Sequence, residues 1–155
     1  MLYMRLVRMI EEHAEQLTRG VLHDLATNTR TPAYHKLPRE ELHRRLYDVY
    51  RNLGRWLGEK TDEMIKSSYS ELGQKRCIEG IPLSEVVYAL VLTKYHLWDY
   101  IRSSGLVDSA VELYQEQELH RLLDHFFDKA TYYTVRGYEH EAASWHAPPA
   151  VVPRH

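Results

Sequence analysis

The chain has 155 residues and a formal net charge of −2, with 44% hydrophobic and 27% charged residues. These values are typical of a globular domain that buries its own core, and they are unlike those of a disordered chain. The near balance of charge gives no indication of a nucleic-acid partner. Cys77 is the only cysteine, which excludes an internal disulfide and fits a reducing cytoplasm.

The first residues, MLYMRLVRMIEEHAEQL, do not predict a targeting segment. Arg and Glu interrupt the apolar run, and no small-residue cleavage site follows it, so the pattern is not that of a signal peptide. No stretch of the sequence approaches the ~20 apolar residues of a membrane span. We therefore expect a soluble, cytoplasmic protein with no membrane partner.

Apolar residues at helical spacing predict a first helix from about residue 2 to about residue 27. The segment TNTRTPAYHKLP, with two prolines and several turn-forming residues, then breaks it. A second helix is expected to begin near Pro38, with Glu40 and Glu41 favourable at the positive end of the helix dipole. Gly58 is expected to interrupt this helix.

A third helix is predicted to end at about residue 79, with a weaker and more polar stripe. Gly73 lies inside this helix, where glycine costs about 1 kcal/mol relative to alanine. Close approach of a neighbouring helix would offset that cost. Gly80 is expected to cap the C-terminus of the third helix, and Pro82 is expected to open a fourth.

The fifth helix is predicted to be the longest, from about residue 107 to about residue 143. Residues 144–155, SWHAPPAVVPRH, hold three of the six prolines and are expected to form a disordered tail. No stretch alternates with a period of two for long enough to propose a strand. The sequence therefore predicts a single all-α domain over residues 1–143, a globin-like bundle of five main helices.

The fourth helix, in residues 80–101, is apolar nearly all round. Lys94 falls within its main apolar arc. Either the methylenes of Lys94 lie on the core while its ammonium reaches water or a carboxylate, or Lys94 holds an anionic ligand or a carboxylate across a subunit interface. The main apolar arc consists of Leu83, Val86, Val87, Leu90, Leu97, Trp98 and Ile101.

The opposite face of the same helix carries Tyr88, Leu92 and Tyr95, and it needs a cover. The helix is either central in its domain, or it has one face in the core and the other in a dimer interface, which we call the seam. We favour the seam, because tyrosines are enriched at interfaces, and we therefore expect a homodimer. The candidate ligand or interface residues are Lys94, Tyr88, Leu92, Tyr95 and Trp98.

Ten histidines are present, and His120 is distinctive because it lies on a second apolar stripe of the fifth helix. It also belongs to a ladder at four-residue steps, Glu112, Glu116, His120 and Asp124. The ladder either binds a metal ion or forms ordinary (i, i+4) pairs. An inward histidine in an all-α domain also permits axial haem ligation, with His120 the best-placed candidate, followed by His96 and His43. Haem or metal binding is thus the alternative to our main prediction, which includes no cofactor and no metal site.

Catalytic signatures are lacking in the sequence. It contains no Gly-x-Ser-x-Gly motif, no phosphate-binding glycine loop and no Cys–His pair at a plausible spacing. We therefore predict a protein that is not an enzyme and assign no catalytic residues.

The segment YSELGQKRCIEGIPLSEVVYALVLTKYHLWDYI resembles the N-terminal domain of RsbR-type and RsbRD-type proteins, the RsbT co-antagonists of bacterial stressosomes. RTPAY, LPREEL and FFDKATYYTVRGYE are also similar to that family. The resemblance implies a globin-like helical domain that usually binds no haem, dimerises, and passes a signal to an attached output domain. The motif falls on Leu72, Gly73, Arg76, Gly80, Ile81, Pro82, Leu83, Glu85 and Trp98.

The resemblance transfers no catalytic residues and leaves the output partner open. We expect a non-enzymatic sensory or protein-interaction domain of a bacterial stress-response type. Its input would be a small ligand in a helix-lined pocket or a partner protein. Its output would be a shift of the fourth or fifth helix that biases a packed two-state interface.

Overall fold

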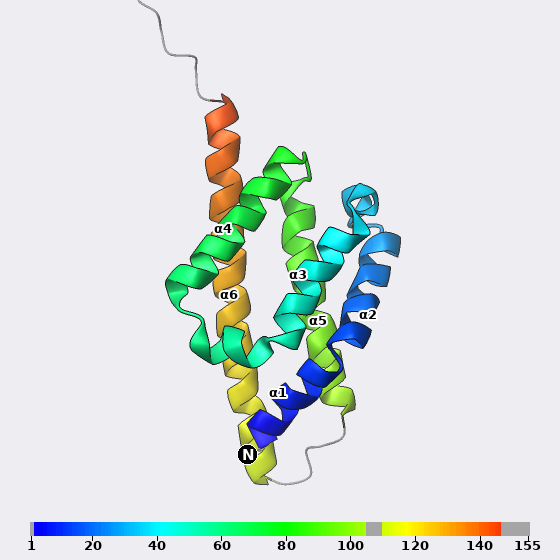
Figure 1. The fold of residues 1–155 in the computed structure, drawn as a ribbon, viewed down its shortest axis with the longest axis vertical. Coiled ribbons are helices and arrows are strands. Elements are labelled where there is room, and N and C mark those ends of the chain that lie inside the picture. Colours follow the sequence, from blue (N-terminus) through cyan, green and yellow to red (C-terminus); the bar gives the residue numbers. More distant parts are fainter. Residues whose placement is uncertain (1, 105–109, 147–155) are drawn as a thin grey trace, which may run out of the picture.

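The computed structural model describes residues 2–104 and 110–146, and every regular element in these ranges is a helix (Figure 1). The all-α prediction is therefore confirmed. None of the described helices combines the length and the apolar character needed to cross a bilayer. The elements are α1 (Leu2–Glu12), α2 (Ala14–Thr27), the 3-10 helix η1 (Pro32–Lys36), α3 (Arg39–Arg51), the π-helical turn η2 (Arg55–Glu59), α4 (Asp62–Ile78), α5 (Leu83–Ser103) and α6 (Ala110–His146).

The first predicted helix is divided into α1 and α2 at His13. The imidazole Nδ1 of His13 donates to the carbonyl oxygen of Met9 over 2.8 Å, and the backbone of His13 leaves the helical region at φ −106° and ψ 20°. Both pieces turn their apolar residues to the same core, where Ile10 and Ala14 are fully buried on either side of the break. The expectation of one continuous helix over residues 2–27 is therefore wrong at this point.

The second predicted helix breaks earlier than expected. α3 ends at Arg51, and the side-chain amide of Asn52 donates to the carboxylate of Asp48 over 3.0 Å. The chain continues as the π-helical turn η2, which buries Trp56. Gly58, the expected interruption, lies within η2 and faces open space.

α4 and α6 are packed against each other at two glycines. A Cβ built on Gly73 would overlap the carbonyl oxygen of Thr134 and would lie 2.8 Å from the amide nitrogen of Tyr138. A Cβ built on Gly137 would overlap the carbonyl oxygen of Ser70. Figure 1 shows α4 lying against the long α6. The expectation that Gly73 permits close approach of a neighbouring helix is confirmed.

The turn between α4 and α5 lies at the residues that the sequence predicted, Gly80 and Pro82. Gly80 has a φ of 76°, and the amide of Ile81 donates to the carbonyl oxygen of Arg76 over 3.0 Å, which closes the C-terminus of α4. Pro82 is the N-cap of α5. The hydroxyl of Tyr138 on α6 donates to the carbonyl oxygen of Ile81 over 2.6 Å, so this turn is also attached to α6.

α5 occupies a central place in the fold, in contact with α1, α2, α4 and α6. The hydroxyl of Tyr50 on α3 donates to the carbonyl oxygen of Thr93 over 2.7 Å, and both residues are buried. The core-facing residues of α5 come from more than one side of the helix, so neighbours within the chain cover most of its circumference. They are Val86, Leu90, Leu92, Leu97 and Ile101.

α6 continues through Ser144 and Trp145, three residues past the boundary expected at residue 143. The indole Nε1 of Trp145 donates to Glu141 Oε1 over 2.9 Å, one turn back along the helix. Residues 147–155 of the expected tail lie outside the described residues. The end of α6 projects beyond the neighbouring helices in Figure 1.

Candidate functional site: a groove between α5 and α6

Three of the five sequence-predicted ligand or interface residues line one hollow between α5 and α6. They are Lys94, Tyr95 and Trp98, all on α5. The hollow has a volume of about 350 Å³. Its other lining residues are Arg102, His120 and Asp124. The leading haem-ligand candidate and the leading interface candidates, proposed for different reasons, thus share one surface.

Trp98 and His120 join the two helices at the centre of this surface. Their rings are stacked, with centroids 3.6 Å apart and planes inclined by 22°. His120 Nε2 also lies 3.4 Å from Glu116 Oε1, one turn earlier on α6. One face of the imidazole is therefore covered by an indole, and one edge faces a carboxylate.

Lys94 makes the second contact between the two helices. Its ammonium lies 3.2 Å from Asp124 Oδ1, with side chains 29% and 52% exposed. The ammonium of Lys94 thus reaches a carboxylate of the same chain. Exposed pairs contribute about 0–1 kcal/mol, so this one stabilises the α5–α6 contact only weakly.

The hollow continues on the other side of His120 and Asp124. Leu113, Glu116, Gln117 and Arg121 complete this second part, which has a volume of about 540 Å³. We call the two parts together the α5–α6 groove. Tyr95 and Leu113 are 55% and 48% exposed. The groove therefore combines exposed apolar side chains with charges of both signs.

Tyr88 and Leu92 do not contribute to the groove. Leu92 is only 5% exposed and belongs to the core of the chain itself. The hydroxyl of Tyr88 accepts a hydrogen bond from Arg30 over 3.3 Å, and the guanidinium of Arg30 lies 5.6 Å from the centre of its ring. On the face of α5 that was expected to need a partner subunit, Leu92 is thus covered from within the chain, and Tyr88 is half-buried.

The other two haem-ligand candidates lie apart from His120 and from each other. His96 Nε2 is 2.9 Å from Asp24 on α2, and His43 Nε2 is 2.7 Å from Glu15. Burial raises the pKa of Asp24, but the hydrogen bonds from His96 and Asn28 outweigh it and hold that pKa below its ordinary value. Each of the two imidazoles is thus paired with a carboxylate of α2.

The predicted metal ladder is divided between two contacts. Glu116 faces His120, whereas Asp124 faces Lys94. The side chain of Glu112 lies outside the described ones. Within the part of the chain that is described, no three His, Cys, Asp or Glu side chains converge as metal ligands.

Most of the motif residues are buried, and their polar members belong to a network outside the groove. Arg76 is 1% exposed, and its guanidinium donates to Glu41 over 3.0 and 3.2 Å and to Glu79 over 2.7 Å. Burial raises the pKa of Glu41, but the charge of Arg76 and the hydrogen bonds from Arg45, Arg76 and Lys75 together outweigh this, and the pKa is lowered. Burial also raises the pKa of Tyr34, which lies under the same guanidinium, to about 12.

Glu85 completes this network, because its Oε1 accepts a hydrogen bond from the backbone amide of Ala33 over 2.7 Å. Arg76 was identified from the sequence only as a residue of the family motif. Its network was missed, because its carboxylate partner Glu41 lies 35 residues away in the chain. Trp98, the aromatic residue of the motif, lines the groove. The polar motif residues therefore hold α4 and η1 in place through hydrogen bonds, and Trp98 contributes to the groove.

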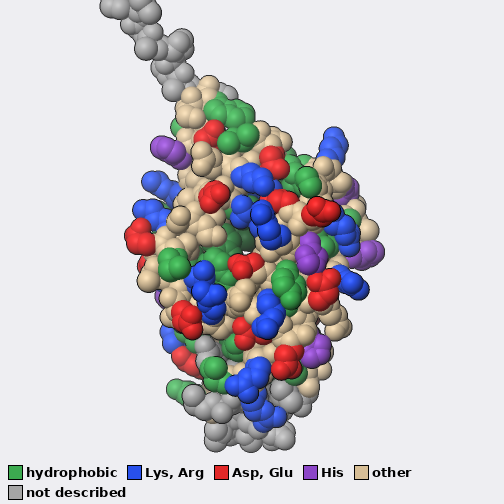
Figure 2. Space-filling view, viewed as in Figure 1, with side chains coloured by type: hydrophobic (Ala, Val, Ile, Leu, Met, Phe, Trp, Pro, Cys, Tyr) green, Lys and Arg blue, Asp and Glu red, His purple; other side chains and the backbone are tan. Residues whose placement is uncertain are grey.

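Charges on the face drawn in Figure 2 are interspersed, with Lys and Arg next to Asp and Glu over the whole view. This distribution agrees with the formal net charge of −2. A surface of this kind gives no strong field of one sign for steering a polyanion.

Residues 11–148 match the family model of the RsbT co-antagonist protein rsbRD N-terminal domain, and the chain belongs to this family. It is a family of stress-response signalling domains, which indicates protein partners. No curated protein and no solved structure matches the chain.

Proposed function

We propose that this domain is a non-enzymatic signalling module of a bacterial stress response, and that the α5–α6 groove is where a partner acts on it. Family membership supports the signalling role. The observation that carries the proposal is the stack of Trp98 on His120, because a residue of the family motif here joins two helices at the surface.

The proposed output is a change in how α5 lies against the first half of α6. The two contacts between these helices in the groove, Trp98 with His120 and Lys94 with Asp124, are each of modest strength. A partner that binds one residue of either contact in place of its present neighbour changes the position of α5 relative to α6. α6 is held against α4 at Gly73 and Gly137, so the helix transmits the change as a unit about that contact.

The proposed partner is a second copy of the chain, and the two copies form a homodimer through the groove. Exposed Tyr95 and Leu113 supply apolar contact area, and Arg102, Arg121, Glu116 and Asp124 supply both signs of charge. Tyrosine and arginine are enriched at interfaces of this type. The proposal includes the globin-like helix arrangement that the family resemblance implies and the cytoplasmic location expected from the single cysteine and the lack of a targeting segment.

Light scattering over a dilution series tests the dimer. We expect a wild-type dimer, and a dissociation constant raised by about tenfold or more in Tyr95→Ser because an interface aromatic is lost. Tyr132→Ser is the matched control, since Tyr132 is 59% exposed on α6 outside the groove. A monomer at the highest attainable concentration, or equal weakening by both variants, contradicts the proposal.

A further inference from the structure

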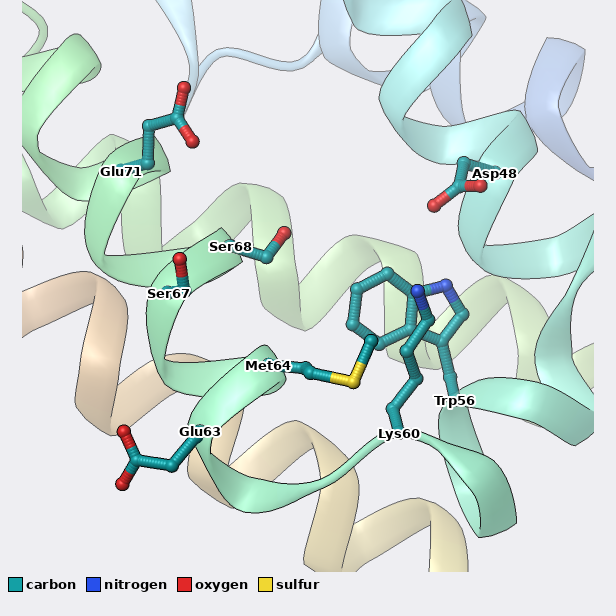
Figure 3. A pocket seen from close by; sticks show the side chains of 8 residues that line it. All are labelled: Asp48, Trp56, Lys60, Glu63, Met64, Ser67, Ser68 and Glu71. Carbon is teal, nitrogen blue, oxygen red and sulfur yellow. The ribbon is translucent and has the colours of Figure 1, made fainter.

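A second hollow lies on a different part of the molecule, between α3, η2 and α4 (Figure 3). Its volume is about 510 Å³, within the usual range of small-molecule sites. Nothing in the sequence analysis pointed to it. Its lining residues are Asp48, Trp56, Lys60, Glu63, Met64, Ser67, Ser68 and Glu71, and we call it the Trp56 hollow.

Trp56, which lines this hollow, carries a hydrogen-bond donor without a partner. The residue is only 6% exposed, and its indole Nε1 is buried without a hydrogen-bond partner in the described structure. Figure 3 shows the indole nitrogen turned toward the side where Asp48 lies. The indole N–H can only donate, so what is missing is an acceptor. Buried donors are nearly always satisfied, which makes this one an indication of an absent group.

The ring cannot easily turn to find an acceptor elsewhere. Tyr69 and Phe126 pack against the indole at centroid distances of 5.9 and 5.6 Å. Asp48, the carboxylate on the side to which the indole nitrogen is turned, already accepts from the Asn52 amide over 3.0 Å. Trp56 also lies on a π-helical turn, an irregularity that is frequent at functional sites. The donor is therefore held in place by its packing.

The charges around the hollow are divided between its two sides. On the Trp56 side, the ammonium of Lys60 lies 4.8 Å from the centre of the indole ring. On the α4 side, Glu63 and Glu71 flank the hydroxyls of Ser67 and Ser68. With Asp48, the carboxylates outnumber the ammonium. The hollow therefore disfavours phosphates and other dianions, and it favours a ligand that carries one acceptor end and a surplus of positive charge.

We propose that the Trp56 hollow binds a free amino acid with a basic side chain. The ligand carboxylate accepts from the Trp56 N–H and pairs with Lys60. The α-ammonium and the side-chain cation face Asp48, Glu63 and Glu71. This site is separate from the α5–α6 groove, and its occupation goes beyond the proposed dimer.

Titration calorimetry of the full chain with L-arginine tests the proposal. We expect saturable binding in the micromolar to millimolar range. Agmatine, which keeps the guanidinium and lacks the carboxylate, is expected to bind about tenfold or more weakly, because the Trp56 donor stays unpaired. L-glutamate is expected to bind least, because it adds negative charge to an acidic hollow. No binding of L-arginine, or equal binding of agmatine, overturns the proposal.

Trp56→Phe removes the N–H and keeps an aromatic ring. We expect this substitution to lower the affinity for L-arginine about tenfold and to leave the affinity for agmatine nearly unchanged. The preference for a ligand with a carboxylate would then disappear. Trp145→Phe is the matched control, because Trp145 is an exposed tryptophan of α6 outside both hollows, and it should bind L-arginine as the wild type does. If circular dichroism shows that Trp56→Phe does not fold, Glu71→Gln at the exposed rim is used instead. This substitution is expected to lower the affinity for L-arginine more than the affinity for L-alanine. Retention of full L-arginine affinity in the folded variant overturns the proposal.

The two proposals fail independently. Trp56→Phe is expected to leave the dimer intact, and Tyr95→Ser is expected to leave L-arginine binding intact.

Discussion

Gly73 of α4 and Gly137 of α6 lie where the two helix backbones touch with no side chain between them. Each glycine faces a backbone carbonyl of the other helix, that of Thr134 for Gly73 and that of Ser70 for Gly137. The carbonyls belong to regular helices and cannot move aside separately. The contact therefore excludes every residue with a Cβ at these two positions.

Gly137→Ala is expected to destabilise the protein by about 3 kcal/mol or to prevent folding. Overpacking typically costs 1–3 kcal/mol, and a clash with backbone belongs at the upper end because no rotamer relieves it. The better helix propensity of alanine recovers only about 1 kcal/mol of this. Urea unfolding followed by circular dichroism measures the difference.

Gly58→Ala is the matched control for this substitution. A Cβ at Gly58 meets nothing within 4 Å. Its free energy of unfolding is expected to stay within about 1 kcal/mol of the wild-type value. Equal effects of the two substitutions would contradict the account of the helix crossing.

Glu41 is expected to make stability depend on pH in the acid range. Its pKa is lowered in the folded chain, where the charge of Arg76 and the hydrogen bonds from Arg45, Arg76 and Lys75 together outweigh the effect of burial. A lowered folded pKa means that the contribution is present above the unfolded value of about 4.3 and is lost as the pH falls through the folded pKa. Glu41→Gln should therefore be less stable than the wild type at pH 7, with the difference narrowing below about pH 4.

Unfolding by urea at a series of pH values measures this effect. Glu118→Gln is the control, because Glu118 also has a lowered pKa but is an exposed residue paired with Arg121. Its effect on the free energy of unfolding should be much smaller, as is usual for surface pairs. A constant difference between Glu41→Gln and the wild type at all pH values would refute the linkage.

The stack of Trp98 on His120 is expected to couple α5 and α6 energetically. A double-mutant cycle with Trp98→Leu and His120→Leu should give a coupling free energy of about 0.5–1.5 kcal/mol, as for other ring pairs. The comparison cycle uses Trp98 and His125, an exposed residue outside the groove. Its coupling should be within about 0.5 kcal/mol of zero. Similar coupling in both cycles would mean that the stack does not join the helices.

Local features were predictable where one short segment decides them. Gly80 and Pro82 marked the turn between α4 and α5, because a positive φ and a fixed φ are properties of those residues. His13 was missed because α1 and α2 keep the same apolar periodicity on both sides of the break. A single hydrogen bond to the Met9 carbonyl leaves no pattern in the sequence.

Long-range relations were only partly predictable. Lys94, Trp98 and His120 were each chosen from the face of one helix, but periodicity does not give the register between two helices, so their convergence was not foreseen. Leu92 was assigned to a seam because a helical wheel cannot show that the chain itself covers that face. The unmatched Trp56 donor depends on the π-helical turn, which no sequence pattern predicted.

The contact at Gly73 and Gly137 also makes α6 a lever with a fixed pivot. At 1.5 Å per residue, His120 lies about 23 Å on one side of that pivot and His146 about 16 Å on the other. A sideways push on the helix at the Trp98 stack therefore appears at the far end in the opposite direction, at about two thirds of its size. Substitutions that loosen the pivot would abolish this reversal even where every residue of the groove stays in place.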